Sequence, residues 1–156
     1  MAAGHGKNMR ASALEASFGK TPVVAFPGSS GGTSVYLSLH TGNPGDDGQT
    51  ANEVTTTTSG YARVNVPAAN WANAVVGAND AAVTISNSAT VTFGPSSGAN
   101  AAWGTITHVG AWKDASSTSS ANFLGRIPIS PTVNITAAGQ SVPFAIGALT
   151  FTDNSS

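Results

Sequence analysis

The stretch SVYLSLHTGNPGDDGQTANEVTTTTSGYARVNV, residues 34–66, decides the fold. Its first part alternates apolar residues with more polar ones, at Val35, Leu37 and Leu39, which is the period of a β-strand with one buried face. The turn cluster NPGDDG follows, and a second strand pattern begins after Gly60. The stretch therefore predicts antiparallel β-structure.

Similar short runs continue to the C-terminus, at residues 62–66, 81–86, 89–93, 105–112, 122–128, 132–136 and 141–152. Turn clusters such as GPSSG, DASSTSS and TAAGQ separate them, and no helical stretch is long enough for βαβ crossovers. We predict an all-β fold, an antiparallel β-sandwich of about eight strands with the architecture of a jelly roll. A phase slip in the last run predicts a β-bulge at Gly147.

The first 33 residues differ from the rest. Asn8 is a candidate N-cap for a short helix that carries Leu14 and Phe18 at i and i+4, and the segment TPVVAFPGSSGG that follows is punctuated by Pro and Gly. We predict an extended N-terminal arm over residues 1–33 with a short helix, and a β-sandwich domain over residues 34–156. Because a helix this short is not stable alone in water, we expect a neighbouring subunit to hold the arm.

Composition narrows the class of protein. The chain has 156 residues, enough for one domain or one domain plus an arm, and only 8% of them are charged. The first twenty residues carry three cations against one anion, too few cations for a nucleic-acid platform. No run approaches the ~18 apolar residues of a membrane span, and no signal peptide is evident. We expect no direct nucleic-acid or membrane partner, and assembly in a host cytoplasm.

Oxygen ligands gather in the loop after the first strand. Asp46, Asp47 and Glu53 are the candidate calcium ligands there, because carboxylates are the oxygen donors that calcium prefers. The spacing does not match an EF-hand loop, and Asp and Gly after Pro44 are also what a tight turn selects. A plain turn is the preferred interpretation, and no cofactor is expected.

The sequence gives no pattern of a catalytic site. The chain has no cysteine, which excludes thiolate chemistry and disulfides. His40 and His108 each lie within a strand pattern with no second ligand at metal spacing, His5 lies in the arm, and the G-x-S-x-G elbow is missing. We therefore expect that the protein is not an enzyme.

The tryptophans have two interpretations. Trp112 ends the strand pattern TITHVGAW and is predicted to lie in the core. Trp71 and Trp103 lie in Ala/Asn-rich loops, where they either cap the ends of the sandwich or, with Tyr36 and Tyr61, stack on sugars or anchor a protein interface. The sequence leaves this alternative open.

The series VYLSLHTGNPG, NEV and GYARVNV, followed by ITHVGAW and FLGRIPIS, resembles a group of small structural proteins of tailed-bacteriophage virions. The resemblance covers roughly residues 34–130 and implies a virion component. Members of this group are labelled tail fibre or minor structural proteins, and the wider class includes jelly-roll cement proteins that decorate capsids. The TTTTS run and the 33-residue arm depart from the shared pattern.

The leading hypothesis from this resemblance is a capsid cement or decoration protein that stabilises the head shell through its arm and its β-sandwich. The predicted partners are the major capsid protein and other copies of the chain, in a homo-oligomer on the virion. The predicted partner-binding residues of the arm are Arg10, Leu14, Phe18, Lys20, Val23, Val24 and Phe26.

Two alternatives remain. One is a tail or tail-fibre-associated protein that takes part in host adsorption, against which the absence of heptads and of internal repeats counts. The other is a carbohydrate-binding module with calcium in the 43–53 loop.

One further pair stands out in the opening stretch. Arg63 is the only charged residue of its strand pattern, and Glu53 precedes it in the loop. We predict that Glu53 and Arg63 form a structural clamp across this loop.

Overall fold

The computed structural model describes residues 13–19, 34–77 and 82–154. The chain divides into two compact units. The first unit takes its described residues from the ranges Met1–Ser34, Pro67–Ala89 and Ala145–Ser156, and the second takes them from Val35–Val66 and Thr90–Phe144. The predicted boundary between an arm and a body at residue 33 stays a prediction.

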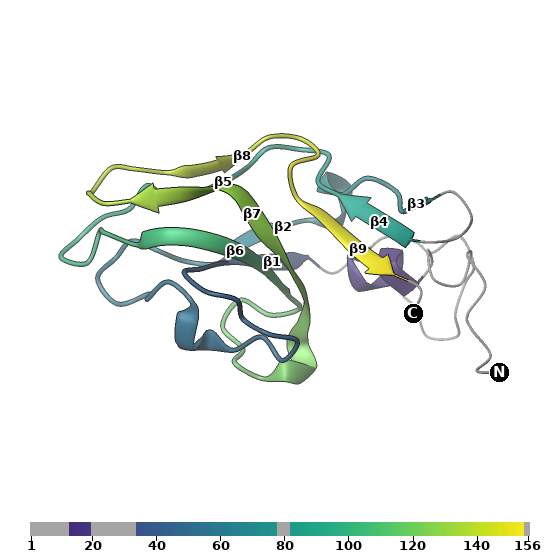
Figure 1. The fold of residues 1–156 in the computed structure, drawn as a ribbon, viewed down its shortest axis with the longest axis horizontal. Coiled ribbons are helices and arrows are strands. Elements are labelled where there is room, and N and C mark those ends of the chain that lie inside the picture. The colour runs from purple at the N-terminus through teal and green to yellow at the C-terminus, as the bar shows by residue number, and fades with distance from the viewer. Residues whose placement is uncertain (1–12, 20–33, 78–81, 155–156) are drawn as a thin grey trace. The chain divides into compact units, whose positions relative to one another are not determined.

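The second unit is built on a four-stranded antiparallel sheet of order β2-β1-β6-β7 (Figure 1). Its strands are β1 (Val35–His40), β2 (Val64–Val66), β6 (Gly104–Trp112) and β7 (Phe123–Ile135). A second sheet pairs β5 (Val91–Phe93) with β8 (Val142–Phe144), and β5 lies beside β2. Two 3-10 turns, η1 (Thr50–Asn52) and η4 (Ser120–Asn122), lie in the loops of this unit.

Aromatic rings pack within the β5–β8 sheet and between it and the segment before β2. Tyr61 stacks on Phe93 of β5 with the ring centroids 6.5 Å apart, and Phe93 meets Phe144 of β8 edge to face at 6.1 Å. The predicted apolar face of β1 is buried at Leu37 and Leu39, but the expectation of only one buried face is wrong, because Ser38 and His40 of the opposite face are buried too. Sheet-on-sheet packing therefore forms the core of this unit.

The first unit is a three-stranded antiparallel sheet of order β3-β4-β9. Its strands are β3 (Val75–Val76), β4 (Ala82–Ser86) and β9 (Thr150–Asn154), with a 3-10 turn η2 (Ala68–Asn70) and helical residues at 13–17. Phe18 follows the helical residues and packs against Trp71 and Phe151, with ring centroids 4.5 and 5.2 Å apart. The end of this helix is thus bound to its own chain.

The predicted all-β antiparallel fold with one short helix near the N-terminus is confirmed. The strand pattern differs from the prediction in three places, the last of them at Gly147. The predicted runs 122–128 and 132–136 form the single strand β7, and the short strand β3 was not predicted.

The predicted bulge at Gly147 is wrong. The run 141–152 is not one strand, since β8 ends at Phe144 and β9 begins at Thr150, and the two pair with different sheets. Asn87 holds the segment between the two strands, because its side-chain NH₂ donates to the Ala145 carbonyl and its side-chain oxygen accepts from the Leu149 amide. Gly147 lies in a turn with φ of 78°.

Candidate functional site

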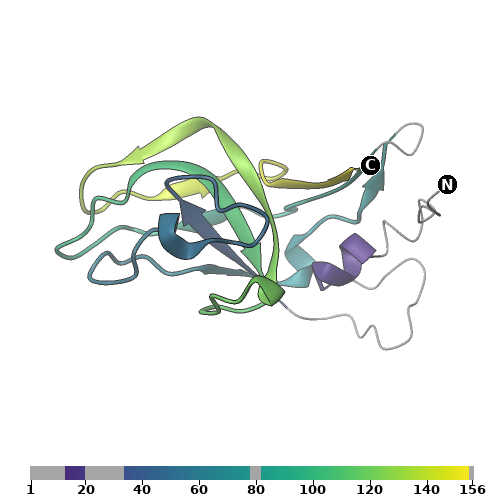
Figure 2. The ribbon, with the colours of Figure 1, turned by 60° about the horizontal axis from the view of Figure 1, so that its bottom comes forward.

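The candidate site lies in the second unit, where the loop after β1 returns to the end of that strand. The Thr41 amide donates to the Asn52 carbonyl at 2.8 Å, and the Val54 amide donates to the Leu39 carbonyl at 3.0 Å. His40 and Glu53 form an isolated antiparallel bridge at the base of the loop. The loop, which carries η1 (Figure 2), is therefore closed at its base by backbone hydrogen bonds. These bonds fix the position of the Glu53 backbone.

Glu53 and Arg63 form a two-pronged ion pair. Arg63 Nη2 donates to Glu53 Oε2 at 2.7 Å, and Arg63 Nε donates to Glu53 Oε1 at 2.9 Å. Only 5% of the Arg63 side chain and 11% of the Glu53 side chain are exposed. A planar guanidinium matches a carboxylate in this parallel geometry, so the pair has direction as well as charge.

Two further contacts fix the Arg63 guanidinium. Its Nη1 donates to the backbone carbonyls of Asp114 and Ser117, at 3.2 and 2.9 Å. Its carbon Cζ lies over the Trp112 ring, 3.9 Å from the centroid. Arg63 therefore connects the returning loop, the end of β6 and the loop that follows β6.

Tyr61 completes the anchoring of Glu53. Its hydroxyl donates to Glu53 Oε1 at 3.0 Å and accepts a hydrogen bond from the Leu39 amide at 2.9 Å. Burial, with a further contribution from the Glu53 charge, raises the pKa of Tyr61 far above its ordinary value, so the phenol stays protonated. A protonated phenol can donate to the carboxylate, as the geometry requires.

A buried serine–histidine pair lies nearby. Ser38 Oγ is 2.7 Å from His40 Nε2, and Trp112 Nε1 donates to the same Ser38 oxygen at 2.8 Å. Both Ser38 and His40 are 0% exposed, so no substrate can reach the hydroxyl as the chain is folded here. Burial lowers the pKa of His40 to about 4, and the imidazole is neutral at pH 7. The Ser38–His40 pair is therefore a buried structural contact that holds the Trp112 side chain.

Glycine is required on both sides of this cluster. A Cβ at Gly110 would lie 2.6 Å from Ser38 Oγ and 2.9 Å from His40 Nε2. A Cβ at Gly48 would lie 2.7 Å from the Trp112 ring and closer still to Phe123. The loop and β6 thus approach the Trp112 cluster more closely than any side chain at these two positions allows.

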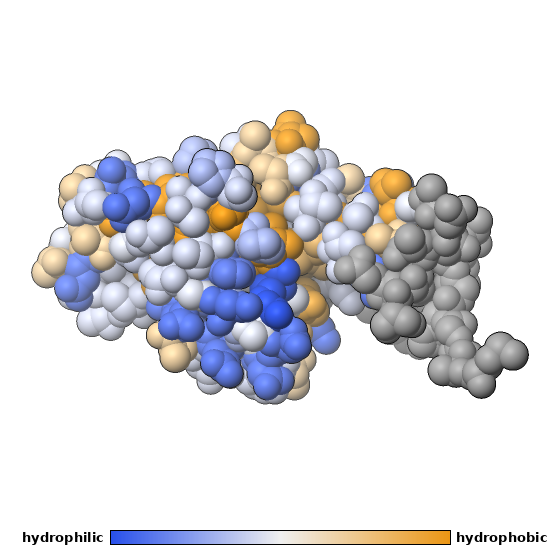
Figure 3. Space-filling view, viewed as in Figure 1, coloured by the Kyte–Doolittle hydropathy of each residue, from blue (hydrophilic) through white to orange (hydrophobic). Residues whose placement is uncertain are grey.

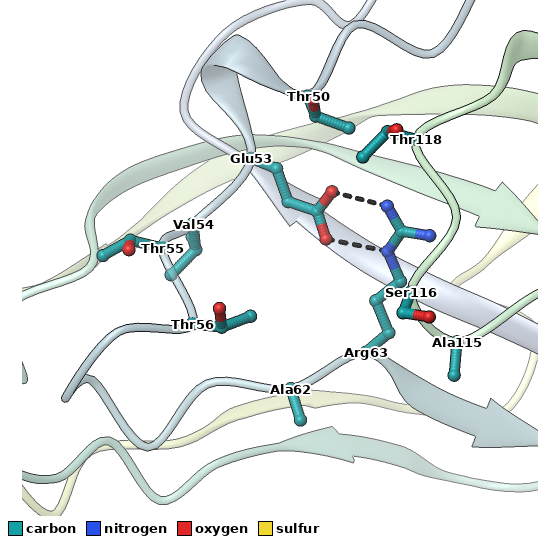
Figure 4. A pocket seen from close by; sticks show the side chains of 10 residues that line it. All are labelled: Thr50, Glu53, Val54, Thr55, Thr56, Ala62, Arg63, Ala115, Ser116 and Thr118. Atoms are coloured by element: carbon teal, nitrogen blue, oxygen red, sulfur yellow. Dashed lines mark hydrogen bonds and ion pairs between the residues drawn. The ribbon is translucent and has the colours of Figure 1, made fainter.

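A pocket of about 460 Å³ opens beside the ion pair. Figure 4 shows Glu53 and Arg63 facing each other in it, with Thr56 and Ala62 on one side and Thr50 and Thr118 on the other. The complete lining is Thr50, Glu53, Val54, Thr55, Thr56, Ala62, Arg63, Ala115, Ser116 and Thr118. Five of the ten lining residues carry a hydroxyl group, the lining surface as a whole is more apolar than polar, and its one ion pair is neutral, so the pocket suits a ligand without net charge.

Residues 11–152 match the family described as podophage GP4 fiber I protein gp80. The chain belongs to this family. No curated protein matches the sequence. The fibre-family match confirms the predicted resemblance at the level of a bacteriophage virion structural protein, and it fits the tail-fibre alternative better than capsid cement.

The calcium candidates of this fibre-family chain do not converge. Glu53 is engaged by Arg63, and Asp46 forms an ion pair with Arg126 of β7 while 93% of its side chain stays exposed. Asp47 is exposed. Among the described residues, no group of three or more histidine or acidic side chains is placed to hold a metal ion.

The predicted arm residues are only partly described in the structure. Leu14 is half-buried, and Phe18 is 1% exposed in the core of its own unit. The other five, Arg10, Lys20, Val23, Val24 and Phe26, lie outside the described residues, as does His5. Phe18 thus presents no surface to a partner in this conformation.

All three tryptophans of the fibre-family chain are buried. Trp112 lies in the core as predicted, and the alternative left open for Trp71 and Trp103 is decided in favour of burial. Trp71 packs in the first unit, and Trp103 Nε1 donates to the Ser59 carbonyl at 2.8 Å in the second. These rings are therefore not a platform on which sugars stack.

His108 has a different environment from His40. It lies opposite His40 in the β1–β6 register, is half-buried, and its Nδ1 is 2.9 Å from Thr107 Oγ1. Burial lowers the pKa of His108, with a smaller contribution from the Arg126 charge. It has no part in the pocket.

Sequence reasoning paired Glu53 with Arg63 but missed Tyr61 as their partner. The signal was present, since Tyr61 and Arg63 are two residues apart and side chains at i and i+2 of an extended chain share a face. The contacts of Trp112 and Ser117 with Arg63 could not be predicted from neighbouring residues in the sequence, because they depend on the pairing of β1 with β6.

No helix in the part of the chain that the structure describes is long and apolar enough to cross a membrane.

Proposed function

We propose that this virion protein is a component of a tail fibre that takes part in adsorption to the host, and not a capsid cement. The match of residues 11–152 to a podophage fibre family carries the proposal. The match extends over both units, so the proposal concerns the whole fold and not one motif.

The two compact β units support a role other than that of a shaft. Residues 1–156 contain no heptads or repeats with which to build a shaft, so these residues would pack against other parts of the fibre or against copies of themselves. Figure 3 shows much of the visible face of the second unit in pale, weakly polar shades with some apolar residues between them, and the largest group of strongly hydrophilic residues low in the view. A surface of this kind associates through shape and hydrogen bonds more than through charge.

The proposal includes no reaction. Ser38 and His40, the one serine–histidine pair within hydrogen-bond distance among the described residues, are sealed from solvent. The Glu53 carboxylate is held by Arg63 and Tyr61. We assign these residues to structure.

Removal of the protein from the virion tests the proposal. Particles that lack it are expected to keep shells of unchanged heat stability and to bind host cells less, and supplying the gene in trans is expected to restore binding. Heat-labile shells with normal adsorption would instead support the cement hypothesis. Density for the protein in an electron-microscopy map of the intact virion gives an independent location, at the tail or on the head.

A further inference from the structure

We propose that the pocket beside Glu53 and Arg63 binds a neutral ligand that carries neighbouring hydroxyl groups, of the size of one or two sugar rings. This inference rests on the proposed adsorption function and names the chemical class of the ligand. It begins from size, because about 460 Å³ lies within the range of roughly 300–1,000 Å³ typical of small-molecule sites.

The walls of the pocket carry unused hydroxyl groups. The hydroxyls of Thr50, Thr56 and Thr118 make no hydrogen bond within the described part of the chain. The Thr55 hydroxyl differs, because its oxygen accepts a hydrogen bond from the Thr57 amide. The Ser116 hydroxyl donates to the Asp114 carboxylate. Three hydroxyls from two separate loops thus border one concavity, each able to donate and to accept.

Charge excludes ionic ligands. The Glu53 carboxylate neutralises Arg63, and four of the five N–H groups of Arg63 already donate to Glu53, Asp114 and Ser117. An anion would compete with Glu53, and a cation would meet Arg63. A neutral ligand meets neither cost.

The ion pair itself favours a polyol. Glu53 Oε2 accepts one hydrogen bond from Arg63, and a carboxylate oxygen has room for a second. A ligand hydroxyl can donate to that oxygen while its neighbour bonds to a threonine. Because Tyr61, Trp112 and two backbone carbonyls hold the pair in place, little order is lost when a ligand binds.

Binding at a single pocket is expected to be weak. None of the ten lining residues is aromatic, so no ring stacks on the sugar, and a dissociation constant of about 1 mM is expected for a monosaccharide. A repeating polysaccharide would bind several copies on a fibre at once and gain avidity.

The test is to titrate sugars into the ¹⁵N-labelled full chain and to monitor the chemical shifts of its backbone amides by NMR. The probes are methyl glucoside, methyl galactoside, methyl rhamnoside and N-acetylglucosamine, each to about 50 mM. Inorganic phosphate and a neutral Ser/Thr-rich peptide are titrated in parallel. We expect at least one sugar to give saturable shifts at Thr56, Arg63 and Ser116, and phosphate to give none.

Variants locate the site. Thr56→Val and Thr118→Val each remove one hydroxyl at nearly constant volume, and each is expected to weaken binding about fivefold. Thr57→Val is the matched control, since Thr57 is exposed, adjacent to Thr56 and outside the lining, and it is expected to bind as the wild type does.

Three outcomes would overturn the inference: no shift with any of the four sugars, equal shifts with phosphate or the peptide, or full binding by the double variant Thr56→Val/Thr118→Val. Its failure is distinguishable from failure of the fibre role. If particles without the protein lose adsorption while particles with the double variant adsorb normally, the fibre role stands and the pocket does not carry it.

Discussion

Arg63 lies over Trp112, with its guanidinium carbon 3.9 Å from the centroid of the indole ring. The edge of the same guanidinium holds the Glu53 carboxylate through two hydrogen bonds. One cation thus joins a buried ring of β6 to the loop that returns from β1. The loop would otherwise have mainly its backbone closure and the packing of Gly48 to hold it there.

Replacement of Arg63 is expected to destabilise the fold by loss of this geometry. Arg63→Lys keeps the charge but cannot reproduce the two-pronged contact, the stacking and both carbonyl bonds, and we expect a loss of about 2 kcal/mol in the free energy of unfolding. Arg63→Ala leaves Glu53 without its cation, and we expect it to lower the free energy of unfolding by about 3 kcal/mol. Urea unfolding measures both.

A double-mutant cycle with Glu53→Gln isolates the pair. We expect a coupling energy of about 1–3 kcal/mol between Glu53 and Arg63. Asp46→Asn is the control, because Asp46 also pairs with an arginine but is almost fully exposed, and no measurable change is expected. Additive effects of Arg63→Ala and Glu53→Gln would show that the clamp does not stabilise the loop.

Tyr61→Phe is expected to lower the free energy of unfolding by about 1–3 kcal/mol, and with it the melting temperature. The variant leaves the buried Leu39 amide without its acceptor and removes one donor to Glu53. Tyr36→Phe is the matched control. The Tyr36 hydroxyl accepts only a long bond of 3.5 Å from Asn65, so its removal is expected to leave the melting temperature unchanged. Equal shifts for the two variants would contradict the assigned role.

His40 is expected to make stability depend on pH. Its pKa is about 4 in the folded chain and about 6.5 when unfolded, so the unfolded state binds more protons between these values. The stabilising contribution is complete above pH 6.5 and falls as the pH approaches 4. From pH 7 to pH 5 we expect a loss of about 2 kcal/mol from this group.

The measurement is urea unfolding at pH 7 and pH 5 for the wild type and for His40→Gln. The variant is expected to be less stable at pH 7 and to lose less stability between the two pH values. His108→Gln serves as the comparison, since burial lowers the pKa of His108 too but His108 is more exposed, and a smaller effect of the same sign is expected. A wild type with the same stability at both pH values would refute the assignment.

How far the sequence predicts this structure depends on how local each cause is. The β1 alternation at Leu37 and Leu39, and the Glu53–Arg63 pair, follow from short-range pattern and from the scarcity of charge. The break between β8 and β9 does not, because an apolar run continues through Ile146, and Asn87, which bonds to the segment between the strands, lies far away in the sequence. Ile146 is 68% exposed as a result.

The tryptophans make the same point for the site. Trp71 and Trp103 have Ala and Asn as neighbours, so no periodicity indicates which face is buried. Their burial depends on partners such as Phe18 and Ser59, which only the fold brings to them. The pocket could not be predicted either, since its walls come from segments more than fifty residues apart.

Calcium is expected to leave the protein unchanged. Asp46 and Glu53 are each paired with an arginine, and Asp47 stands apart, so the loop offers no set of free carboxylates. We expect equal melting temperatures with calcium and with EGTA. A rise with calcium that Asp47→Asn abolishes would restore the calcium interpretation.

Phe18 is expected to stabilise the first unit although it lies in the predicted arm. It is 1% exposed and touches the rings of Trp71 and Phe151, so Phe18→Ala opens a cavity among large side chains, and a loss of about 3–4 kcal/mol is expected. Thermal unfolding followed by tryptophan fluorescence measures it, with Ser17→Ala as the control because Ser17 is exposed in the preceding turn. If the arm served only to reach a partner, both variants would melt as the wild type does and differ only in assembly on the virion. If only Phe18→Ala lowers the melting temperature, Phe18 belongs to a core. Deletion of residues 1–30 would then remove part of this core, and its effect on assembly would have to be separated from unfolding.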